Sequence, residues 1–270
     1  MSAAPRRSAP VAITGAGVVS PLGDRPELVF DALCRGESSL APVTAFDPEG
    51  LPSRLAGEVR DFEPRRYLGD GNLRPLDRTG RLAAAAATLA LGDAGWDAEA
   101  RRGAEVGLAL GTMFGSVHTI SEFDRRALTA GPNYAKPMDF ANSVINAAAG
   151  QTAIWHDLRG VNSTLSGGTT GGLAALAYGA GLVAAGRADA VLAGGADEVC
   201  FESFQGFARA GLTAGSAATN GGGRPGAVGS REHPVPLDAD RNGFAPAEAA
   251  ALLVLESPES ARRRGARVLA

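Results

Sequence analysis

The hydrophobic pattern divides the chain into short apolar runs and longer helical stretches. Four apolar runs lack regular polar positions, as strands buried on both faces do. They read "VAITGAG" from Val11, "EVGLALGT" from Glu105, "ADAVLAGGAD" from Ala188 and "EAAALLVLES" from Glu248. Their alternation with helical stretches predicts a layered α/β fold. The first run is expected to leave the sheet through a glycine turn.

The stretches between these runs predict helices. Residues 24–36 predict a helix capped by Asp24, with Pro26 in its first turn and Gly36 at its end. The alanine-rich stretch 77–96 has few polar residues on any face, so its helix should be packed on several sides. Further helices are expected at three places: 117–130, 138–160 and 171–187.

Other segments are poor in such patterns. Residues 1–10 predict a polar lead-in, and residues 41–74, rich in Pro, Gly and Arg, predict irregular surface. A flexible insertion is expected at 214–231, inside a domain that spans 11–256. Residues 257–270 predict a helix, a glycine stop and the first residues of a new strand. The chain is therefore expected to be one half of a larger fold, ending in the joint to a C-terminal half.

Composition narrows the functional classes. Of the 270 residues, 45% are hydrophobic and 20% are charged, which suits a full core, and the net charge of −3 does not favour nucleic acid. No apolar run approaches the ~20 residues of a membrane span. Two cysteines, Cys34 and Cys200, make no disulfide framework, and with no secretion signal they indicate the cytoplasm.

Neither a metal nor a cofactor is expected. The three histidines are scattered, without the spacing of metal ligands. "GAGVVSPLG" lacks the third glycine of a dinucleotide loop. In "HDLRG", His156 and Arg159 are expected to fix a loop by hydrogen bonds. Phe114 and Phe207 are core residues by default, and gain interest only if they face a cavity.

The stretch "VNSTLSGGTTGGLAAL", from Val161 to Leu176, predicts a strand that turns sharply into a buried helix. Enzymes place nucleophiles at such elbows, because a helix N-terminus stabilises negative charge. Here the elbow offers Thr169 and Thr170, which are poor nucleophiles without help. A close helix–strand contact would also explain the glycines. Their density in one turn favours a relict or specialised site.

Several segments, taken in order, resemble the β-ketoacyl-ACP synthase (ketosynthase) family of the thiolase superfamily. They are "VAITGAGVVSPLG", "GTMFGS", "AAGQTAIWHDLRG", "ADAVLAGGADE" and "DADRNGFAPAEAAALLVLE". The resemblance includes the family's non-condensing chain-length-factor branch. It implies a thiolase-like layered fold of two similar βαβαβαββ halves, usually dimeric, of which only the N-terminal half is present here.

The resemblance also assigns site residues. It places Thr169 on the family's nucleophilic cysteine, and a threonine hydroxyl is too weak an acid for the helix dipole to ionise. It places Phe114 in the wall of the acyl pocket and Phe207 at the gating phenylalanine. Residues 138–146 match the helix that packs across the dimer. The family's catalytic histidines and lysine belong to the half that is missing here.

The leading hypothesis is a non-condensing, ketosynthase-like subunit of fatty-acid or polyketide assembly. It would pair with a ketosynthase or a separate C-terminal-half subunit, as a hetero- or homodimer, and contact acyl carrier protein. A split synthase is a variant of this hypothesis. Alternatively, Thr169 or Ser166 accepts an acyl group with a base from a partner, which would make the chain an acyltransferase. A third reading is a truncated product without a stable fold.

Overall fold

The computed structural model describes residues 9–216 and 231–270. The expected insertion at 214–231 and the expected lead-in at 1–10 therefore lie mainly outside the described residues. Within the described ranges, no helix combines the length and apolar character that crossing a membrane requires.

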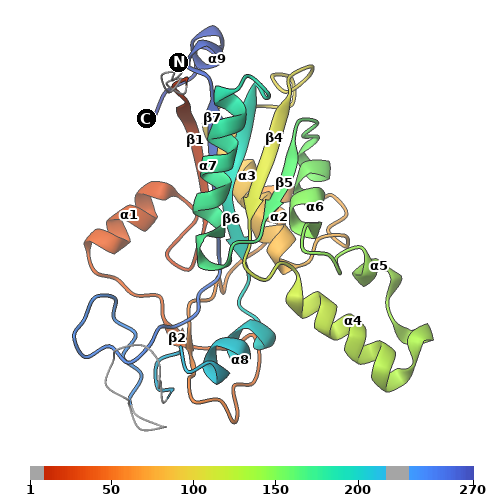
Figure 1. Ribbon diagram of the computed structural model, residues 1–270, viewed down its shortest axis with the longest axis vertical. Helices are drawn as coiled ribbons and strands as arrows, with labels where there is room; N and C mark the ends of the chain where they lie inside the picture. Colours follow the sequence, from red (N-terminus) through yellow and green to blue (C-terminus); the bar gives the residue numbers. More distant parts are fainter. Residues whose placement is uncertain (1–8, 217–230) are drawn as a thin grey trace, which may run out of the picture.

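A five-stranded mixed sheet forms the centre of the fold, in the order β1-β7-β6-β4-β5 (Figure 1). β7 runs antiparallel to both of its neighbours, whereas β4 pairs in parallel with β5 and β6. The strands are β1 (Ala12–Val19), β4 (Val106–Gly111), β5 (Asn162–Leu165), β6 (Ala190–Asp197) and β7 (Ala249–Glu256). The four apolar runs are thus confirmed as strands, and the elbow stretch contributes the fifth.

Helices cover both faces of this sheet. α7 (Gly171–Ala184) packs on one face, against Ala109, Val191 and Leu255. α3 (Arg78–Asp93) and α6 (Ala147–His156) pack on the other. The alanine run in α3, residues 83–87, is fully buried, as its lack of polar residues predicts. The result is a three-layer α/β/α arrangement, which confirms the layered α/β fold predicted from the sequence.

The remaining elements lie around these layers. In Figure 1, α4 and α5 extend away from the sheet as an arm, and α1 stands off its opposite side. These elements are α1 (Pro26–Cys34), β2 (Ala41–Pro42), β3 (Leu55–Ala56), α2 (Arg65–Leu68), α4 (Val117–Ala130), η1 (Pro132–Tyr134), α5 (Pro137–Phe140), η2 (Gly168–Thr170), α8 (Phe201–Arg209) and α9 (Pro258–Arg264). Helices at 24–36 and 117–130 are confirmed, and residues 41–74 are largely irregular.

Three local predictions are wrong. The expected glycine turn lies inside β1, where Gly15 and Gly17 face the α3 backbone so closely that a side chain would collide with it. Asp24 does not cap α1; its carboxylate accepts a hydrogen bond from the Tyr67 hydroxyl at 2.8 Å. The helix expected at 138–160 is split into α5 and α6. Asn142 lies in the break, with its amide donating to the Pro75 carbonyl at 2.9 Å.

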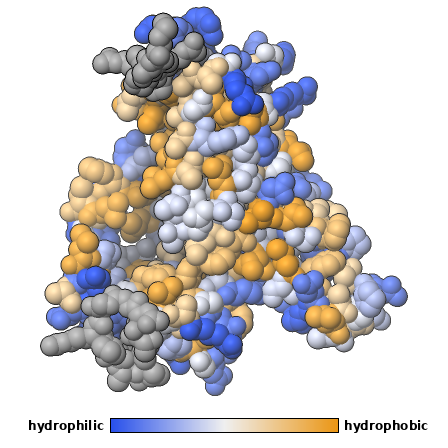
Figure 2. Space-filling view, viewed as in Figure 1, coloured by the Kyte–Doolittle hydropathy of each residue, from blue (hydrophilic) through white to orange (hydrophobic). Residues whose placement is uncertain are grey.

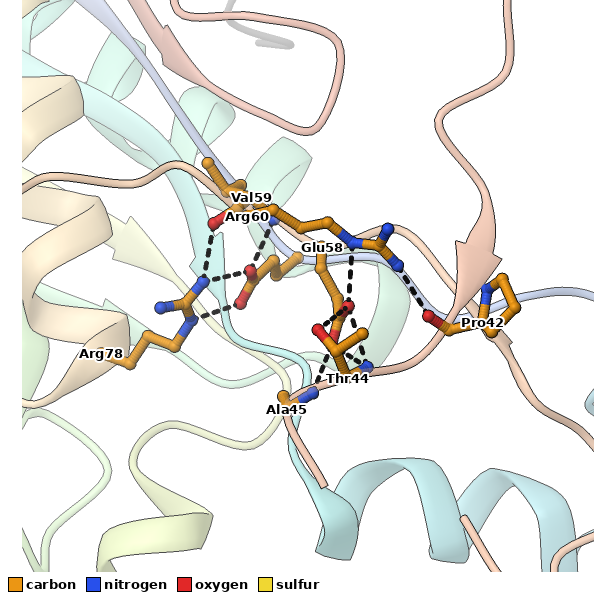
Figure 3. Close-up of polar contacts among 8 residues, drawn as sticks. Pro42, Thr44, Ala45, Glu58, Val59, Arg60 and Arg78 are labelled. Atoms are coloured by element: carbon orange, nitrogen blue, oxygen red, sulfur yellow. Dashed lines mark hydrogen bonds and ion pairs between the residues drawn. The ribbon is translucent and has the colours of Figure 1, made fainter. Parts of the chain in front are cut away.

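Hydrogen bonds to two buried carboxylates, Glu58 and Glu248, hold the irregular segment after β2 against the core. Glu58 accepts hydrogen bonds from the backbone N–H groups of Thr44 and Ala45, and Arg60 donates to the Pro42 carbonyl at 2.6 Å (Figure 3). Glu248, buried just before β7, accepts two hydrogen bonds from Arg78, at 2.5 and 2.7 Å. Because a buried charge needs partners, these contacts fix the path of the segment below the sheet.

The C-terminal residues follow their predicted course in part. Ser257 caps α9 by accepting a hydrogen bond from the Ser260 N–H, and Gly265 ends the helix in the left-handed conformation, with φ of 66°. Residues 266–270 form no strand. Leu269 and Ala270 nevertheless exchange backbone hydrogen bonds of 2.7 and 2.9 Å with Ile13, on β1.

Candidate functional site

The elbow between β5 and α7 is held by its backbone. β5 ends at Leu165, and η2 leads directly into α7 at Gly171. Gly168 has φ of +62°, a conformation that favours glycine, and the Thr170 hydroxyl donates to the Gly167 carbonyl at 3.0 Å. The sharp strand-to-helix reversal is therefore present as the sequence predicts.

The elbow is exposed, so the expectation that the strand turns into a buried helix is wrong at this turn. Thr169, Thr170 and Ser166 all face solvent, and Leu173 in the first turn of α7 is 71% exposed. Small residues suggest burial because they allow close packing on every side. Here they allow close packing on the sheet side alone, since the described residues leave the other side of the turn uncovered.

A cavity of about 360 Å³ opens beside the elbow, where β4 and β6 end. Ligands of α/β sheets commonly bind at the carboxyl ends of parallel strands. All three residues that the resemblance singled out, Thr169, Phe114 and Phe207, line this cavity. Phe114 and Phe207 thus face a cavity, which is the condition set above for a role beyond the core. The rest of the wall comes from Gly111, Thr112, Met113, Gly168, Gly171, Gly172, Gly195, Ala196, Asp197, Glu198, Val199, Ser203, Phe244, Ala245, Pro246, Ala247 and Ala249.

Three aromatic rings form a contiguous part of this wall. Phe114 and Phe207 meet edge to face, with ring centroids 5.4 Å apart, and Phe207 meets Phe244 in the same way at 5.0 Å. Sequence reasoning missed Phe244, although it lies in the quoted motif "DADRNGFAPAEAA". The loop that carries it is tied to the end of α8, because its N–H donates to Leu212 and its carbonyl accepts from Ala214.

Asp197, at the end of β6, was also missed. Its carboxylate accepts hydrogen bonds from the Thr112 hydroxyl at 2.6 Å and from the N–H groups of Met113 and Phe114. Burial raises the pKa of Asp197, and the Thr112 hydrogen bond opposes that rise. The carboxylate therefore fixes the turn after β4 and, with it, the position of Phe114. The sequence signal that could have identified Asp197 is its position, an acidic residue at the end of an apolar strand.

The ionisable side chains that line the cavity are the two carboxylic acids Asp197 and Glu198. Among the lining residues there is no histidine, lysine or cysteine. Cys200 caps α8 beside Ser203, and burial raises the pKa of its thiol to about 11, so it stays protonated. His156 lies behind the sheet, hydrogen-bonded to the Ala84 carbonyl at 2.9 Å, while Arg159 pairs with Asp157 on the surface. The prediction that both residues fix a loop is therefore wrong for His156, which joins α6 to α3, whereas Arg159 makes its hydrogen bond to Asp157 in the loop after α6.

The order of the strands, the two helical layers and the glycine elbow define the chain as an N-terminal half of the thiolase-like fold. Residues 8–261 match the family model described as beta-ketoacyl synthase, N-terminal domain. The chain belongs to this family. The resemblance and the fold class predicted from the sequence are therefore confirmed.

Individual relatives show the same extent of similarity. The 3-oxoacyl-[acyl-carrier-protein] synthase 2 of Coxiella burnetii is 34% identical over 260 residues, which cover 96% of this chain and 61% of that protein. The ishigamide ketosynthase/chain length factor superposes with a TM-score of 0.81 at 33% identity, covering 96% of this chain and 60% of that one. A type II PKS acyl-carrier protein in complex with its ketosynthase bound to the hexaketide matches with a TM-score of 0.77 at 26% identity, over 97% and 61% of the two chains. The chain thus spans about three fifths of the length of these relatives.

Proposed function

We propose that the chain is a ketosynthase-like subunit of fatty-acid or polyketide assembly that shapes an acyl pocket and does not condense acyl chains by itself. The observation that carries this proposal is the cavity in which Phe114, Phe207 and Thr169 meet. Its aromatic wall suits an apolar chain, and its lining includes Thr169 at the elbow, the position that the resemblance places on the family's nucleophilic cysteine. The hydroxyl of Thr169 replaces a thiol there, so no thiolate forms.

Condensation also needs groups that accept and donate protons. The lining residues of the cavity supply Asp197 and Glu198 but no histidine or lysine. Asp197 is engaged with the turn that carries Phe114. A partner that supplies acid–base residues is therefore part of the proposal, either a ketosynthase or a separate C-terminal half. Acyl carrier protein, the partner in one structural relative, would deliver the chain in the cytoplasm.

Exposed apolar side chains support such a partner. Leu28, Phe30 and Leu33 on α1 are 38%, 66% and 61% exposed, and Figure 2 shows apolar surface gathered over this helix. Leu173 on α7 and Phe140 on α5 are exposed as well. A contiguous apolar patch, such as the one over α1, is typical of an interface. A hetero- or homodimer that covers it is the assembly we propose.

The activity test uses the purified chain with acyl-ACP and malonyl-ACP. We expect no β-ketoacyl product above that of Thr169→Ala, and no labelling of residue 169 by a cerulenin-type inhibitor. Product formation by the wild-type chain alone would refute the non-condensing role. Binding of amide-linked acyl pantetheines, which do not hydrolyse, tests the pocket separately, and failure of every chain length to bind would refute the acyl-pocket assignment.

The alternative is an acyltransferase that uses Thr169 or Ser166. Its support is that both residues are exposed at the elbow, where a base from a partner could reach them. Incubation of the chain and its partner with a labelled acyl-ACP would separate the two functions. A covalent acyl ester that disappears in Thr169→Ala or Ser166→Ala favours the acyltransferase, whereas an unlabelled chain favours the scaffold.

A further inference from the structure

Glu198 lies in the wall between two cavities. It follows β6 directly, and its residue is 9% exposed. One of the two cavities is the proposed acyl pocket. The other, of about 250 Å³, is lined by Glu198 together with Arg74, Arg78, Arg81 and His118 among others. Glu198 is the residue that the two linings share.

One oxygen of Glu198 has no partner. Its Oε1 atom is buried and makes no hydrogen bond among the described residues. The neighbouring buried carboxylates differ in this respect, since Asp197 binds the turn after β4 and Glu248 binds Arg78. Buried polar atoms are nearly always hydrogen-bonded, because leaving one unpaired is costly. This oxygen therefore leaves one hydrogen-bonding position open at the cavity wall, for a polar atom of a ligand or for water.

The surroundings of Glu198 favour its neutral form. Burial raises its pKa to about 8, and the negative charges of Asp77, Glu248 and Glu202 act in the same direction, while Arg78 opposes them. Other charged or titratable groups line the same two cavities: Asp197 the acyl pocket, and Arg74, Arg81, His118 and Asp139 the other. At neutral pH, Glu198 is thus mainly a carboxylic acid, which donates one hydrogen bond through its O–H.

The lining of the acyl pocket is mostly aromatic, aliphatic or glycine backbone, and its other polar side chains are Thr112, Thr169, Ser203 and Asp197. Thr112 and Asp197 bind each other and Ser203 binds the Cys200 carbonyl, whereas Glu198 has an oxygen without a partner among the described residues. A saturated acyl chain would leave the carboxyl group unpaired, whereas a keto or hydroxyl oxygen on the chain would accept its hydrogen bond. We propose that Glu198 is a specificity residue that selects acyl chains carrying a keto or hydroxyl oxygen over saturated chains of the same length. This inference rests on the proposed acyl pocket.

Calorimetric titration of the full-length chain tests it with two sets of amide-linked acyl pantetheines. One set is saturated, and the other carries a single keto group at successive carbons of the same chains. We expect the best keto probe to bind about tenfold more tightly than its saturated match, which is the effect of one buried group losing its partner. Glu198→Gln should retain this preference because its amide can still donate, and Glu198→Met should lose it.

A pH series on the wild-type chain needs no variant. The preference for the keto probe should disappear as pH rises through about 8, where the carboxyl group loses its proton, but should persist in Glu198→Gln. Equal binding of keto and saturated probes would overturn this inference alone, leaving the acyl pocket in place. A preference that survives in Glu198→Met would also overturn it. Failure of both sets to bind would overturn the acyl pocket and this inference with it.

Discussion

Gly111 marks the point where β4 comes closest to the elbow. A Cβ atom at this position would lie 2.2 Å from the carbonyl carbon of Gly171, 2.3 Å from its oxygen and 2.4 Å from the nitrogen of Gly172. All three are backbone atoms at the start of α7, so no side-chain rotation can relieve the contact. Gly111→Ala therefore forces the strand and the helix apart.

The size of the effect follows from these distances. Real Cβ atoms essentially never come within 3.0 Å of another heavy atom, so the closest contact must open by 0.8 Å or more. α7 packs on the sheet through Ala175, Leu182 and Val183, and a shift of this size loosens that contact along the helix. Overpacking a core costs about 1–3 kcal/mol, and a collision with backbone belongs at the upper end, about 3 kcal/mol.

The matched control is Gly181→Ala, in the same helix. A Cβ atom there has no neighbour within 4 Å, so this substitution should stabilise α7 by about 0.5–1 kcal/mol. Urea unfolding of both variants measures the difference. Gly111→Ala should lower the midpoint by about 1 M or more, and Gly181→Ala should raise it slightly. Gly111→Ala should also weaken acyl-pantetheine binding, because Gly111, Gly171 and Gly172 all line the cavity.

Two outcomes would refute this reasoning, one for each variant. If Gly111→Ala unfolds at the midpoint of the wild type and binds acyl pantetheine equally well, the backbone contact between β4 and α7 does not shape the cavity. Equal destabilisation by Gly181→Ala would show that α7 responds to any added methyl group, and would remove the special role of Gly111.

Three further predictions test other contacts. Burial lowers the pKa of His156 from 6.5 to about 4, so its contribution to stability is complete above pH 6.5 and is lost as pH falls towards 4. This loss should amount to about 3 kcal/mol in thermal unfolding measured over that pH range, and should be absent in His156→Gln. Glu248→Ala removes the acceptor of Arg78 and of the N–H groups of Val59 and Val199, and should cost about 1–3 kcal/mol in urea unfolding. Glu37→Ala, in an exposed pair, should leave the midpoint unchanged. Thr169→Cys should gain reactivity towards a thiol probe at the α7 N-terminus yet form no condensation product, which mass spectrometry of both reactions would check.

The sequence predicts the sheet well because burial on both faces leaves a simple signal. Residues 190–193 of β6 are all completely buried, and each is apolar. Gly15 and Gly17 were misread because a glycine that permits a turn looks the same as one that permits close packing. In β1, a Cβ atom at Gly17 would lie 2.1 Å from the Ala86 carbonyl oxygen of α3. That contact joins segments far apart in the chain, so local pattern cannot reveal it.

The candidate site was predictable only in part, for a related reason. Phe114 and Phe207 were identified through the resemblance, but their 5.4 Å contact depends on where β4 and α8 end in space. Asp197 and Glu198 are adjacent in the sequence, and both are acidic residues after a buried strand. The Asp197 carboxylate binds the turn after β4, whereas the carboxyl group of Glu198 retains an unpaired oxygen at the cavity wall. Their different surroundings come from the tertiary structure, which a run of two acidic residues does not encode.

The shape of the cavity and the chemistry at its mouth depend on different parts of the chain. The shape depends on buried backbone: Gly111 contacts Gly171, and a Cβ atom on Gly195 would lie 3.2 Å from the Cα of Gly172. The proposed lack of condensing activity depends on Thr169, an exposed side chain on the turn. Replacing an exposed hydroxyl or thiol disturbs no packing, so surface substitutions of this kind usually change stability by less than about 0.5 kcal/mol. An elbow with threonine can therefore keep the whole pocket while lacking a nucleophile, and this is why the proposed scaffold role is compatible with an intact fold.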